Sequence, residues 1–524
     1  MLYINTGVDD AFALVSTSPA ATTGIGSLMA DFTGDGLLDL LTTQGSALAL
    51  IVNTGDTLSF IDTTAGVGLD SITIPSGGIC VPAAADFDLD GNLEIAIVGS
   101  YGDATPSPLS LAKFNIGTGK YENVAAEVLD DTTHKFEAWN PTWVDIDNDG
   151  YIDLFLPSIR VSFPTNRSGL YFNYNGEGLD WSEINIDGLD TDVSAIASVW
   201  GDIDNDGDMD LIAQAFDAPA PFYLLLNNGD GTFTDVAAGS GIAANNQMRG
   251  LSLGDYDNDG DQDLLIGGNG MDLTIYQNQL IGGSFTFTDV TSSTVGTGMG
   301  GHRSALFVDY NSDGLLDVFT SYTSNVKLLK NDLSNSNNWI GFRLSMTEGN
   351  NKSAIGARVR VAAGDLSIIR DIQAGGYGGL TGGNLVAHFG LGFASEADSV
   401  IINWPDGSSK KILGLAANQY YDVDNSEGGV EETQDLPEAF TLTQNYLNPL
   451  TPKTTVSYEI ARESHVRIGV YDLLGREVVS LVNGVKKPGI HTVELNAANL
   501  SSGVYFCRIK TDDFKASQKF LLTK

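Results

Sequence analysis

Short apolar runs alternate with acidic turns along residues 1–332. Around one such turn, the apolar run 198–200 is followed by the acidic stretch 202–210 and then by a second apolar run, 211–213. A third run leads into an Asn-rich turn at 227–229, and a fourth run follows it. Runs this short, with turn signals between them and no 3.6-residue period, predict β-strands and argue against helices.

The same unit of strand, acidic turn and strand occurs six times. The first acidic residues of the six turns, Asp31, Asp86, Asp145, Asp202, Asp255 and Asp309, lie 55, 59, 57, 53 and 54 residues apart. A fixed period of this length indicates a repeated supersecondary unit, and four strands per repeat predict a propeller blade. The sequence therefore predicts an all-β propeller with one acidic loop in each of six blades.

The chain begins halfway through a blade, because residues 2–7 match the third-strand segment 225–229 of a later repeat. Six complete loops and this half blade predict a seven-bladed ring whose first blade is incomplete. The alternative is a six-bladed ring in which the N-terminal strands complete the last blade.

Each acidic turn has the composition of a Ca²⁺ loop, with oxygen-bearing side chains at positions 1, 3, 5 and 9 and glycine at position 6. Alternate side chains of a tight turn converge on one point, and glycine lets the turn close. The predicted side-chain ligands are Asp31, Thr33, Asp35 and Asp39; Asp86, Asp88, Asp90 and Glu94; Asp145, Asp147, Asp149 and Asp153; Asp202, Asp204, Asp206 and Asp210; Asp255, Asp257, Asp259 and Asp263; and Asp309, Asn311, Asp313 and Asp317. Backbone carbonyls are expected from position 7, at Leu37, Asn92, Tyr151, Asp208, Asp261 and Leu315.

Up to six Ca²⁺ ions are thus expected, with the first and sixth loops weaker because Thr33 and Asn311 replace charged ligands by neutral ones. EF-hands are excluded, since they need Glu at position 12, where three of these loops have Leu156, Ala213 and Ile266. Six equivalent copies favour a structural role for Ca²⁺ over a regulatory one.

The formal net charge of −40 excludes some partners. More than half of the acidic excess lies in the six loops, and such a chain repels nucleic acid and anionic membranes. No apolar run approaches the roughly 18 residues of a membrane span. Cys80 and Cys507 form no disulfide framework or metal site.

No catalytic motif stands out, since the five histidines are scattered and neither His-Glu-x-x-His nor Gly-x-Ser-x-Gly occurs. A binding face is favoured instead, in the segments that lead into the acidic loops. The candidate residues are His134, Lys135, Trp139, Gln247, Arg249, His302 and Arg303, whose cationic and aromatic side chains suit an anionic sugar or a protein. The competing interpretation is that Trp143 packs between blades and the arginines pair with loop acids.

Two resemblances follow from these motifs. The pattern Asp-x-Asp-x-Asp-Gly-x-x-Asp-Leu between strands over residues 1–332 resembles FG-GAP/VCBS repeats, which implies an integrin-α-like propeller with cations on one face. Residues 339–424 contain Trp339-Ile-Gly-Phe-Arg-Leu344, Ile355-Gly-Ala-Arg-Val359, His388-Phe-Gly-Leu-Gly392 and Asn403-Trp-Pro-Asp-Gly407. They resemble the β-rich ASPIC/UnbV domain that follows such propellers in cartilage-acidic-protein-like chains.

An acidic Gly/Glu linker, residues 425–436, precedes a last β unit at 437–524. Its segments Val470-Tyr-Asp-Leu-Leu-Gly-Arg-Glu477 and Leu500-Ser-Ser-Gly-Val-Tyr505 resemble the type A C-terminal sorting domain of the type IX secretion system, although Leu447 and Leu450 depart from the usual motif. The resemblance implies a β-sandwich, handling by the type IX machinery, and a secreted or cell-surface protein with an N-terminal signal peptide.

Residues 1–7 do not look like a signal peptide. Together with the half blade, this predicts that the sequence lacks its true N-terminus. The sequence as a whole predicts an exported Ca²⁺-binding propeller that acts in adhesion or in binding a glycan or protein. A carbohydrate-active lyase or hydrolase and a purely structural surface component are the alternatives.

Overall fold

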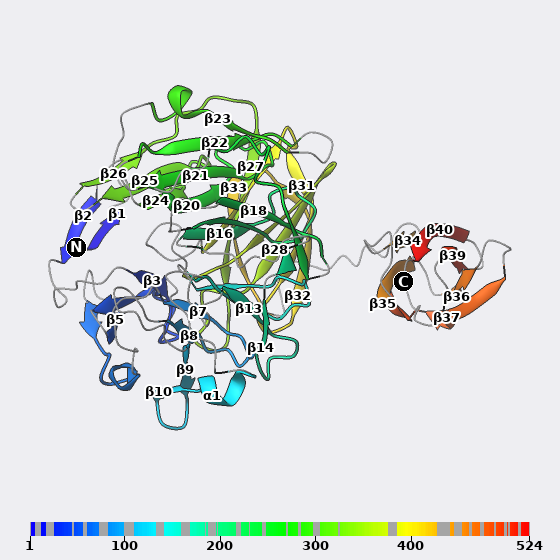
Figure 1. Cartoon of the computed structure of the whole chain (residues 1–524), viewed down its shortest axis with the longest axis horizontal. Coiled ribbons are helices and arrows are strands. Elements are labelled where there is room, and N and C mark those ends of the chain that lie inside the picture. Colours follow the sequence, from blue (N-terminus) through cyan, green and yellow to red (C-terminus); the bar gives the residue numbers. More distant parts are fainter. Residues whose placement is uncertain are drawn as a thin grey trace. The chain divides into compact units, whose positions relative to one another are not determined.

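The chain divides into two compact units, Met1–Glu427 and Gly428–Lys524, and the division falls inside the expected linker. The structure is a computed structural model (Figure 1). It describes residues 2–5, 12–16, 26–44, 47–55, 60–72, 82–98, 109–130, 132, 141–158, 168–183, 185–186, 195, 197–215, 222–229, 231–243, 248–268, 271–280, 285–296, 304–322, 325–375, 385–426, 441–444, 453–460, 464–471, 476–486, 489–496, 500, 503–511 and 515–522.

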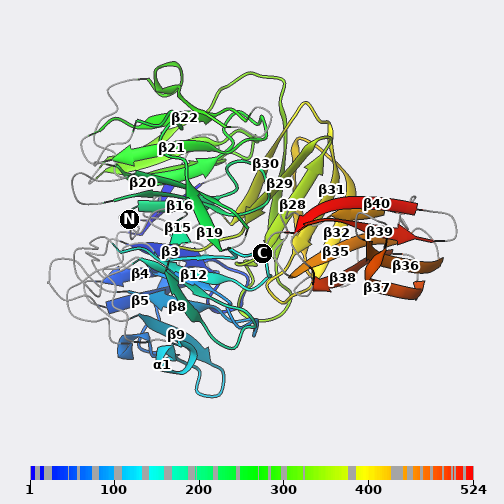
Figure 2. The same cartoon turned by 45° about the vertical axis from the view of Figure 1, so that its right-hand side comes forward.

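Six sheets carry the six acidic loops, each loop joining the first strand of its sheet to the second. The strands are β3 (Ser27–Ala30), β4 (Asp39–Gln44), β5 (Ala47–Asn53) and β6 (Phe60–Asp62); β7 (Ala83–Ala85), β8 (Glu94–Ile97), β9 (Ser110–Asn115) and β10 (Lys120–Asn123); β11 (Thr142–Val144), β12 (Asp153–Leu156), β13 (Gly169–Phe172) and β14 (Asp180–Glu183); β16 (Ala197–Gly201), β17 (Asp210–Gln214), β18 (Phe222–Asn227) and β19 (Thr232–Asp235), with β15 (Asn185–Ile186) at the edge; β20 (Met248–Gly254), β21 (Asp263–Gly268), β22 (Thr274–Asn278) and β23 (Phe287–Asp289); and β24 (Ser304–Val308), β25 (Asp317–Tyr322) and β26 (Asn325–Leu329). All their strand pairs are antiparallel except the pair of β15 with β19, which is parallel. The sheets follow one another around a ring (Figures 1 and 2). This all-β arrangement confirms the fold class expected from the repeat.

The N-terminal strands β1 (Leu2–Asn5) and β2 (Phe12–Ser16) pair with each other in a separate two-stranded sheet. In Figure 1 this pair lies between the β24–β26 sheet and the β3–β6 sheet. Among the described residues, neither strand joins the β24–β26 sheet, as the six-bladed alternative would require. The number of blades stays a prediction.

The blades pack face to face through apolar side chains, which explains why the second strands β8, β12, β17 and β21 are buried along their whole length. Trp200 of β16 meets Phe155 of β12 edge-on, with ring centroids 5.3 Å apart. Trp143 is 3% exposed and stacks on Phe87 of the preceding blade, with centroids 6.0 Å apart. Trp143 therefore packs between blades, as the competing interpretation of that residue held.

An asparagine at the end of the third strand also joins neighbouring blades. Asn227 Nδ2 donates to the carbonyls of Met209 in its own blade and Ile146 in the preceding one, at 3.3 and 2.8 Å. Its backbone N–H donates to Asp210 Oδ1 at 2.9 Å. Asn173, Asn278 and Asn331 repeat the bond to the preceding blade. One amide thus satisfies carbonyls that packing would otherwise leave unbonded.

We expect Asn227→Ala to lower the free energy of unfolding by about 1–3 kcal/mol, because buried carbonyls of two blades lose their donor. The matched control is Asn228→Ala, since Asn228 is exposed and bonds only locally, to Thr232 and Thr234. That substitution should cost less than about 0.5 kcal/mol. Urea unfolding of both variants in the same buffer measures the difference. Equal losses of unfolding free energy would contradict a stabilising role for the hydrogen bonds that Asn227 makes between blades.

Helical structure in the described residues is limited to single turns: α1 (Ala125–Val128), η1 (Leu69–Ser71) and η2 (Thr291–Ser293). The sequence predicted none of these. Just before α1, the side chain of Asn123 bonds the helix backbone: its Oδ1 accepts the backbone N–H of Ala125 at 3.1 Å. This is a local side-chain-to-backbone turn just before the N-cap residue Val124, and hydrophobic periodicity does not reveal it.

Residues 338–424 form two further sheets within the first unit. One contains β30 (Val386–Gly392), β27 (Asn338–Ser345) and β33 (Gln419–Asp424), with β27 and β33 parallel. The other contains β29 (Leu366–Asp371), β28 (Arg358–Ala363), β31 (Glu396–Asn403) and β32 (Ser409–Ala416). Their apolar side chains share one buried core with the sheets β3–β6, β7–β10 and β11–β14. The two parts of this unit therefore pack as one body.

The second unit consists of two sheets, β34 (Thr441–Gln444), β35 (Lys453–Ile460) and β38 (Gly489–Asn496), and β36 (Ser464–Tyr471), β37 (Glu477–Lys486), β39 (Gly503–Lys510) and β40 (Lys515–Leu522). Alternate residues of β36, from Val466 to Val470, are buried. Cys507 is a buried free thiol, and Cys80 lies outside the described residues.

Candidate metal centres

The six acidic loops share one backbone shape. The residue at position 4 has positive φ in every loop: Gly34 (75°), Leu89 (60°), Asn148 (59°), Asn205 (58°), Asn258 (61°) and Ser312 (58°). The position 6 glycines also have positive φ, from 84° at Gly36 to 105° at Gly260. Glycine and asparagine adopt this conformation readily, whereas Leu89 does so at a cost of about 1–2 kcal/mol. The glycine that the sequence singled out is therefore needed for the turn.

Carboxylates converge in four of the six loops. The groups are Asp86, Asp88 and Asp90; Asp145, Asp147 and Asp153; Asp202, Asp204 and Asp206; and Asp255, Asp257 and Asp259, each with ligand atoms within 4.8 Å of one another. The first and sixth loops, although fully described, have no such group of three. This agrees with the weaker binding expected from Thr33 and Asn311, which stays a prediction.

The fourth loop has buried carboxylate oxygens that a cation would satisfy, and Arg370 is a positive group near Asp202. Asp202 is 0% exposed, and neither of its carboxylate oxygens has a hydrogen-bond partner among the described residues. Asp204 Oδ1 is likewise buried and unpartnered. Burying a carboxylate without a partner is costly. A hard cation would satisfy these oxygens, and an all-oxygen donor set fits Ca²⁺.

The carboxylate at position 9 accepts hydrogen bonds from the backbone of its own blade. Asp210 accepts the backbone N–H of Ile203 at 2.8 Å on one oxygen and that of Asn227 at 2.9 Å on the other. Asp39, Asp153, Asp263 and Asp317 accept the same two kinds of bond. Only Asp153 also belongs to a convergent group. Position 9 therefore ties its loop to two strands, and its role as a metal ligand stays a prediction.

Position 7 closes the turn through its backbone N–H, which donates to the position 5 carboxylate in every loop. The donors are Leu37, Asn92, Tyr151, Asp208, Asp261 and Leu315, and the donor–acceptor distances run from 2.8 Å at Tyr151 to 3.1 Å at Asp261. Metal ligation by the carbonyls of these residues stays a prediction.

Burial and mutual repulsion raise the pKa of these carboxyl groups. Burial is the main cause at Asp202, whose pKa rises to about 7, and at Asp204, whose pKa rises to about 6. The pKa of Asp259 rises to about 7 because of burial and the neighbouring Asp257. Without a cation, these loops would hold protons at mildly acidic pH.

We expect Ca²⁺ affinity to fall at least about tenfold between pH 7.5 and pH 5.5, because protons then compete at Asp202 and Asp204. In calcium-free protein the free energy of unfolding depends on pH in the opposite direction. A pKa raised above the ordinary 3.8 means that the folded state binds more protons, so the free energy of unfolding falls as pH rises from about 4 to about 7. Calorimetric titration at both pH values, with chelator melts alongside, measures both effects. An affinity independent of pH would contradict the prediction.

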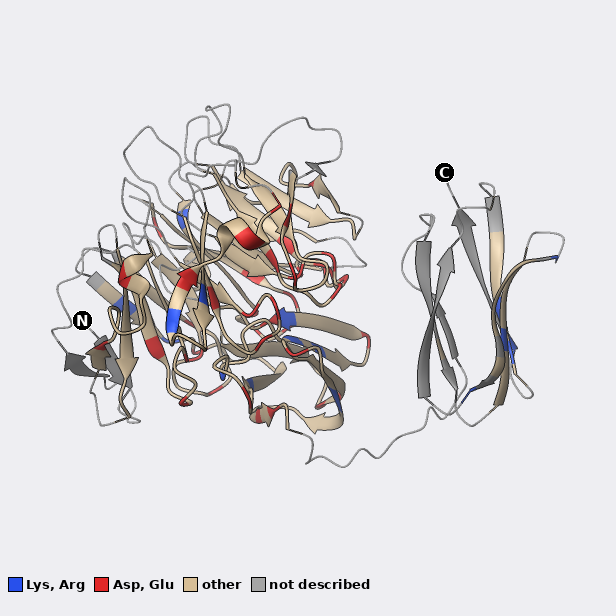
Figure 3. Cartoon of the chain, turned by 90° about the horizontal axis from the view of Figure 1, so that it is seen from below, with Lys and Arg blue, Asp and Glu red and all other residues tan. Residues whose placement is uncertain are grey.

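The strands of residues 338–424 lie against the face of the propeller that carries the acidic loops. Arg358 Nη2 donates to the Asp145 carbonyl of the third loop at 2.8 Å, and Asn350 N donates to the Gly91 carbonyl of the second at 2.6 Å. Gly392 N donates to Asn258 O in the fifth loop at 3.0 Å. Figure 3 shows that many of the acidic residues of this unit lie in loops. Parts of the second, third and fifth loops are therefore covered, whereas Asp147 and Asp149 of the third loop remain exposed.

Neighbouring loops are also bonded to one another. Asn148 Nδ2 donates to Asp208 Oδ1 at 2.5 Å, and Asn205 Nδ2 donates to Asp261 Oδ1 at 3.1 Å. Asn258 Nδ2 donates to the Gly314 carbonyl at 3.0 Å. The sequence signal was the asparagine at position 4 of the third, fourth and fifth loops. The sequence alone does not show that this asparagine bonds the neighbouring loop, because the two loops come together only in the folded chain.

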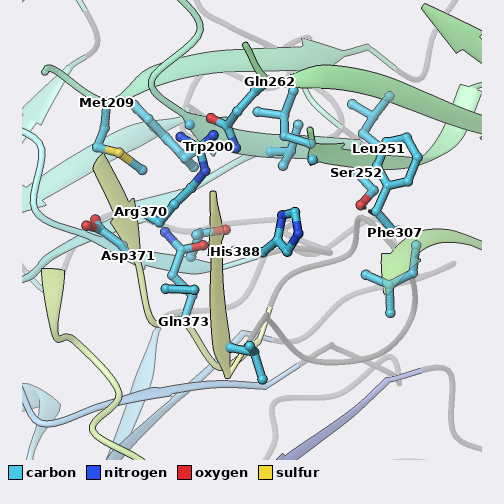
Figure 4. A pocket seen from close by; sticks show the side chains of 18 of the residues that line it. Trp200, Met209, Leu251, Ser252, Gln262, Phe307, Arg370, Asp371, Gln373 and His388 are labelled. Carbon is cyan, nitrogen blue, oxygen red and sulfur yellow. Dashed lines mark hydrogen bonds between the residues drawn. The ribbon is translucent and has the colours of Figure 1, made fainter. Parts of the chain in front are cut away.

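A pocket with a cavity of about 140 Å³ lies between the innermost strands β16, β20 and β24 and the strands β29 and β30. Arg370 extends towards Trp200 and Gln262 (Figure 4). Arg370 Nη2, Trp200 Nε1, Gln262 Oε1 and His388 Nδ1 are buried and lack hydrogen-bond partners among the described residues. The pocket wall thus offers both donors and acceptors to a ligand.

His388 is neutral in this pocket, because burial lowers its pKa to about 4. Its Nε2 lies 3.1 Å from the Gly314 carbonyl oxygen, which can only accept, so Nε2 carries the proton and donates. His388 Nδ1 is therefore an acceptor facing the pocket. Sequence reasoning missed Arg370 and His388 as neighbours because they meet Trp200 only in the folded chain.

Most of the predicted ligand face cannot be located. His134, Lys135, Trp139, Gln247, His302 and Arg303 lie outside the described residues. Arg249 is partly buried, and its Nη1 donates to the Met248 carbonyl at 2.6 Å. The ligand face stays a prediction.

The fold and the loops define a β-propeller protein with repeated acidic turns. Three family models match the chain. The FG-GAP-like repeat matches residues 31–97, 215–266 and 255–320, ASPIC and UnbV matches 347–430, and the secretion system C-terminal sorting domain matches 445–523. The chain therefore carries FG-GAP repeats, an ASPIC/UnbV domain and a type IX sorting domain, which confirms the resemblances drawn from the motifs.

The curated relatives are more distant. Cartilage acidic protein 1 of Homo sapiens is 26% identical over 272 residues, which cover 39% of this chain and 40% of that protein. The Xenopus tropicalis protein of the same name is 25% identical over 254 residues, covering 36% of this chain and 38% of that protein. The match thus spans about two fifths of the length of these relatives.

A solved structure of PorZ, a surface component of the type IX secretion system of Porphyromonas gingivalis, covers 95% of this chain and 81% of its own. It is 11% identical with a TM-score of 0.17, too low to support any argument about this chain.

The sorting domain indicates secretion to the cell surface, as the sequence predicted. Among the described residues, no helix is long and apolar enough to cross a membrane.

Proposed function

We propose that this is a Ca²⁺-binding surface protein that acts in adhesion or ligand binding after export by the type IX machinery. The proposal of Ca²⁺ binding rests on the fourth loop. There, both carboxylate oxygens of the fully buried Asp202 lack a hydrogen-bond partner among the described residues. The convergent groups of the third and fifth loops support it. Bound ions would satisfy these oxygens and fix the turns on which residues 338–424 rest.

The pocket beside Arg370 supports the ligand-binding part. Arg370 Nη1 donates to the Ile369 carbonyl at 2.7 Å, whereas Nη2 has no hydrogen-bond partner among the described residues. Asp371, the acidic residue of the pocket wall, is already bonded to Arg358 at 2.6 and 2.8 Å. A small polar ligand with an acidic group would pair with Arg370, while hydroxyls would donate to His388 Nδ1 or Gln262 Oε1.

The test uses the full chain. Calorimetry with Ca²⁺ should show several sites and the loss of one in Asp204→Asn. The protein should also bind glycans on an array in calcium buffer, and Arg370→Gln should weaken that binding. The control is Arg343→Gln, because the Arg343 side chain is more exposed. Release of new reducing ends or unsaturated sugars would favour a lyase or hydrolase. Stabilisation by Ca²⁺ without any ligand would favour a structural component, and no Ca²⁺ binding would refute the proposal.

A further inference from the structure

The second blade differs from all five others at position 9 and at the asparagine of the third strand, and it shares a lysine on that strand only with the sixth blade. Position 9 is Glu94, whereas every other loop has Asp there. The strand register pairs Ile95 with Ala112, as Leu211 pairs with Leu225 in the fourth blade. Lys113 therefore occupies the place of Leu226, and Phe114 replaces the asparagine that bonds position 9 in the other blades.

Lys113 and Glu94 meet at this loop. Lys113 Nζ contacts Asp88 Oδ2 and lies 2.7 Å from Asp90 Oδ2 and 3.7 Å from Glu94 Oε1. These are the carboxylates at positions 3, 5 and 9 of the second loop. Glu94 is 0% exposed, and Lys113 is the positive group beside its otherwise unpartnered Oε1. The ammonium thus lies among the oxygens that a cation would bind.

We propose that Lys113 is the resident cation of the second loop, so that this loop closes without Ca²⁺. An ammonium donates three hydrogen bonds and carries the positive charge that the carboxylates require. A Ca²⁺ ion on Asp88 and Asp90 would lie a few ångströms from this ammonium and be repelled by it. The inference rests on the proposed Ca²⁺ binding of the other loops and assigns this loop a different occupant.

The strand position of Lys113 holds a different residue type in four of the other five blades and a lysine in the sixth. It carries Val52, Phe172 and Leu226 in the first, third and fourth blades, which add no charge. In the fifth blade Gln277 Nε2 donates to Asp257 Oδ2 at 2.6 Å, a neutral addition to the loop. In the sixth blade Lys330 is 54% exposed, and its Nζ stays 3.7 Å from Asp313. Among the six blades, therefore, only the second places a positive charge from this strand position among the carboxylates of its loop.

Lys330 supplies a matched control, because it is a lysine at the same strand position whose ammonium remains largely in solvent. Equilibrium dialysis with metal analysis of the full chain should show one more bound Ca²⁺ in Lys113→Met than in the wild type. Lys330→Met should bind the same number as the wild type. Replacing Asp88 and Asp90 by Asn should leave the wild-type count unchanged and remove the ion gained by Lys113→Met.

A second measurement keeps the inference testable if Ca²⁺ binds nowhere. In chelator, Lys113→Met should melt several degrees below the wild type, because its carboxylates lose their counter-charge, while Lys330→Met should not. Equal melting of Lys113→Met and the wild type in chelator would overturn the inference, as would loss of a wild-type Ca²⁺ on replacing Asp88 and Asp90. Absence of Ca²⁺ from every variant would refute the proposed function but leave the chelator comparison decisive.

Discussion

We expect chelation of Ca²⁺ to lower the melting temperature of the Met1–Glu427 unit by on the order of 10 °C. Three loops have convergent carboxylates and no resident lysine: the third, fourth and fifth. Each ion held at 100 times its dissociation constant adds about 2.7 kcal/mol to the free energy of unfolding. Three such sites give about 8 kcal/mol, and large domains lose about 1–2 °C per kcal/mol.

The second unit is the internal control for this experiment. Its described residues contain no group of three convergent carboxylates. Differential scanning calorimetry of the full chain in calcium and in chelator should therefore move the transition of the first unit and leave that of the second in place. Two unmoved transitions would contradict cation binding by the loops. An equal shift of both would indicate an effect of the chelator unrelated to the loops.

The repeat explains why so much of the propeller could be predicted. The pattern around Asp202 to Asp210 is local: the alternation of carboxylates, the glycine and the flanking apolar runs specify a turn between two strands. Residues a few positions apart then determine the φ of Asn205 and Gly207, 58° and 96°. Because the same strand, loop and strand pattern occurs six times, the order of the sheets along the chain could be predicted from the repeat.

What escaped prediction depends on contacts between distant parts of the chain. Arg358 bonds Asn148 across 210 positions, and His388 bonds Gly314 across 74. No periodicity links such residues, so the covering of the loops by residues 338–424 could not be inferred. The role of Lys113 depends in the same way on strand register. The motif gives the ligands of a loop but not the side chain that the neighbouring strand directs into it.

Arg358→Met lowers the free energy of unfolding of the first unit by about 3–5 kcal/mol, because it leaves buried carboxylates without their partner. Arg358 is 8% exposed and donates to Asp371 through Nε at 2.6 Å and through Nη2 at 2.8 Å. It also reaches the third loop, with Nη1 3.5 Å from Asp145 Oδ2. One guanidinium thus joins the ASPIC/UnbV strands to a candidate metal loop.

Arg343→Met is the control, because Arg343 also belongs to the ASPIC/UnbV strands but its side chain is 43% exposed, with Asp422 3.8 Å away. An exposed ion pair contributes at most about 1 kcal/mol. Urea unfolding at constant Ca²⁺ compares the two variants. Adding Asp371→Leu to Arg358→Met should recover part of the loss, since the orphaned carboxylate is then removed. A cost for Arg358→Met no greater than that of Arg343→Met would mean that this buried network does not hold the two parts together.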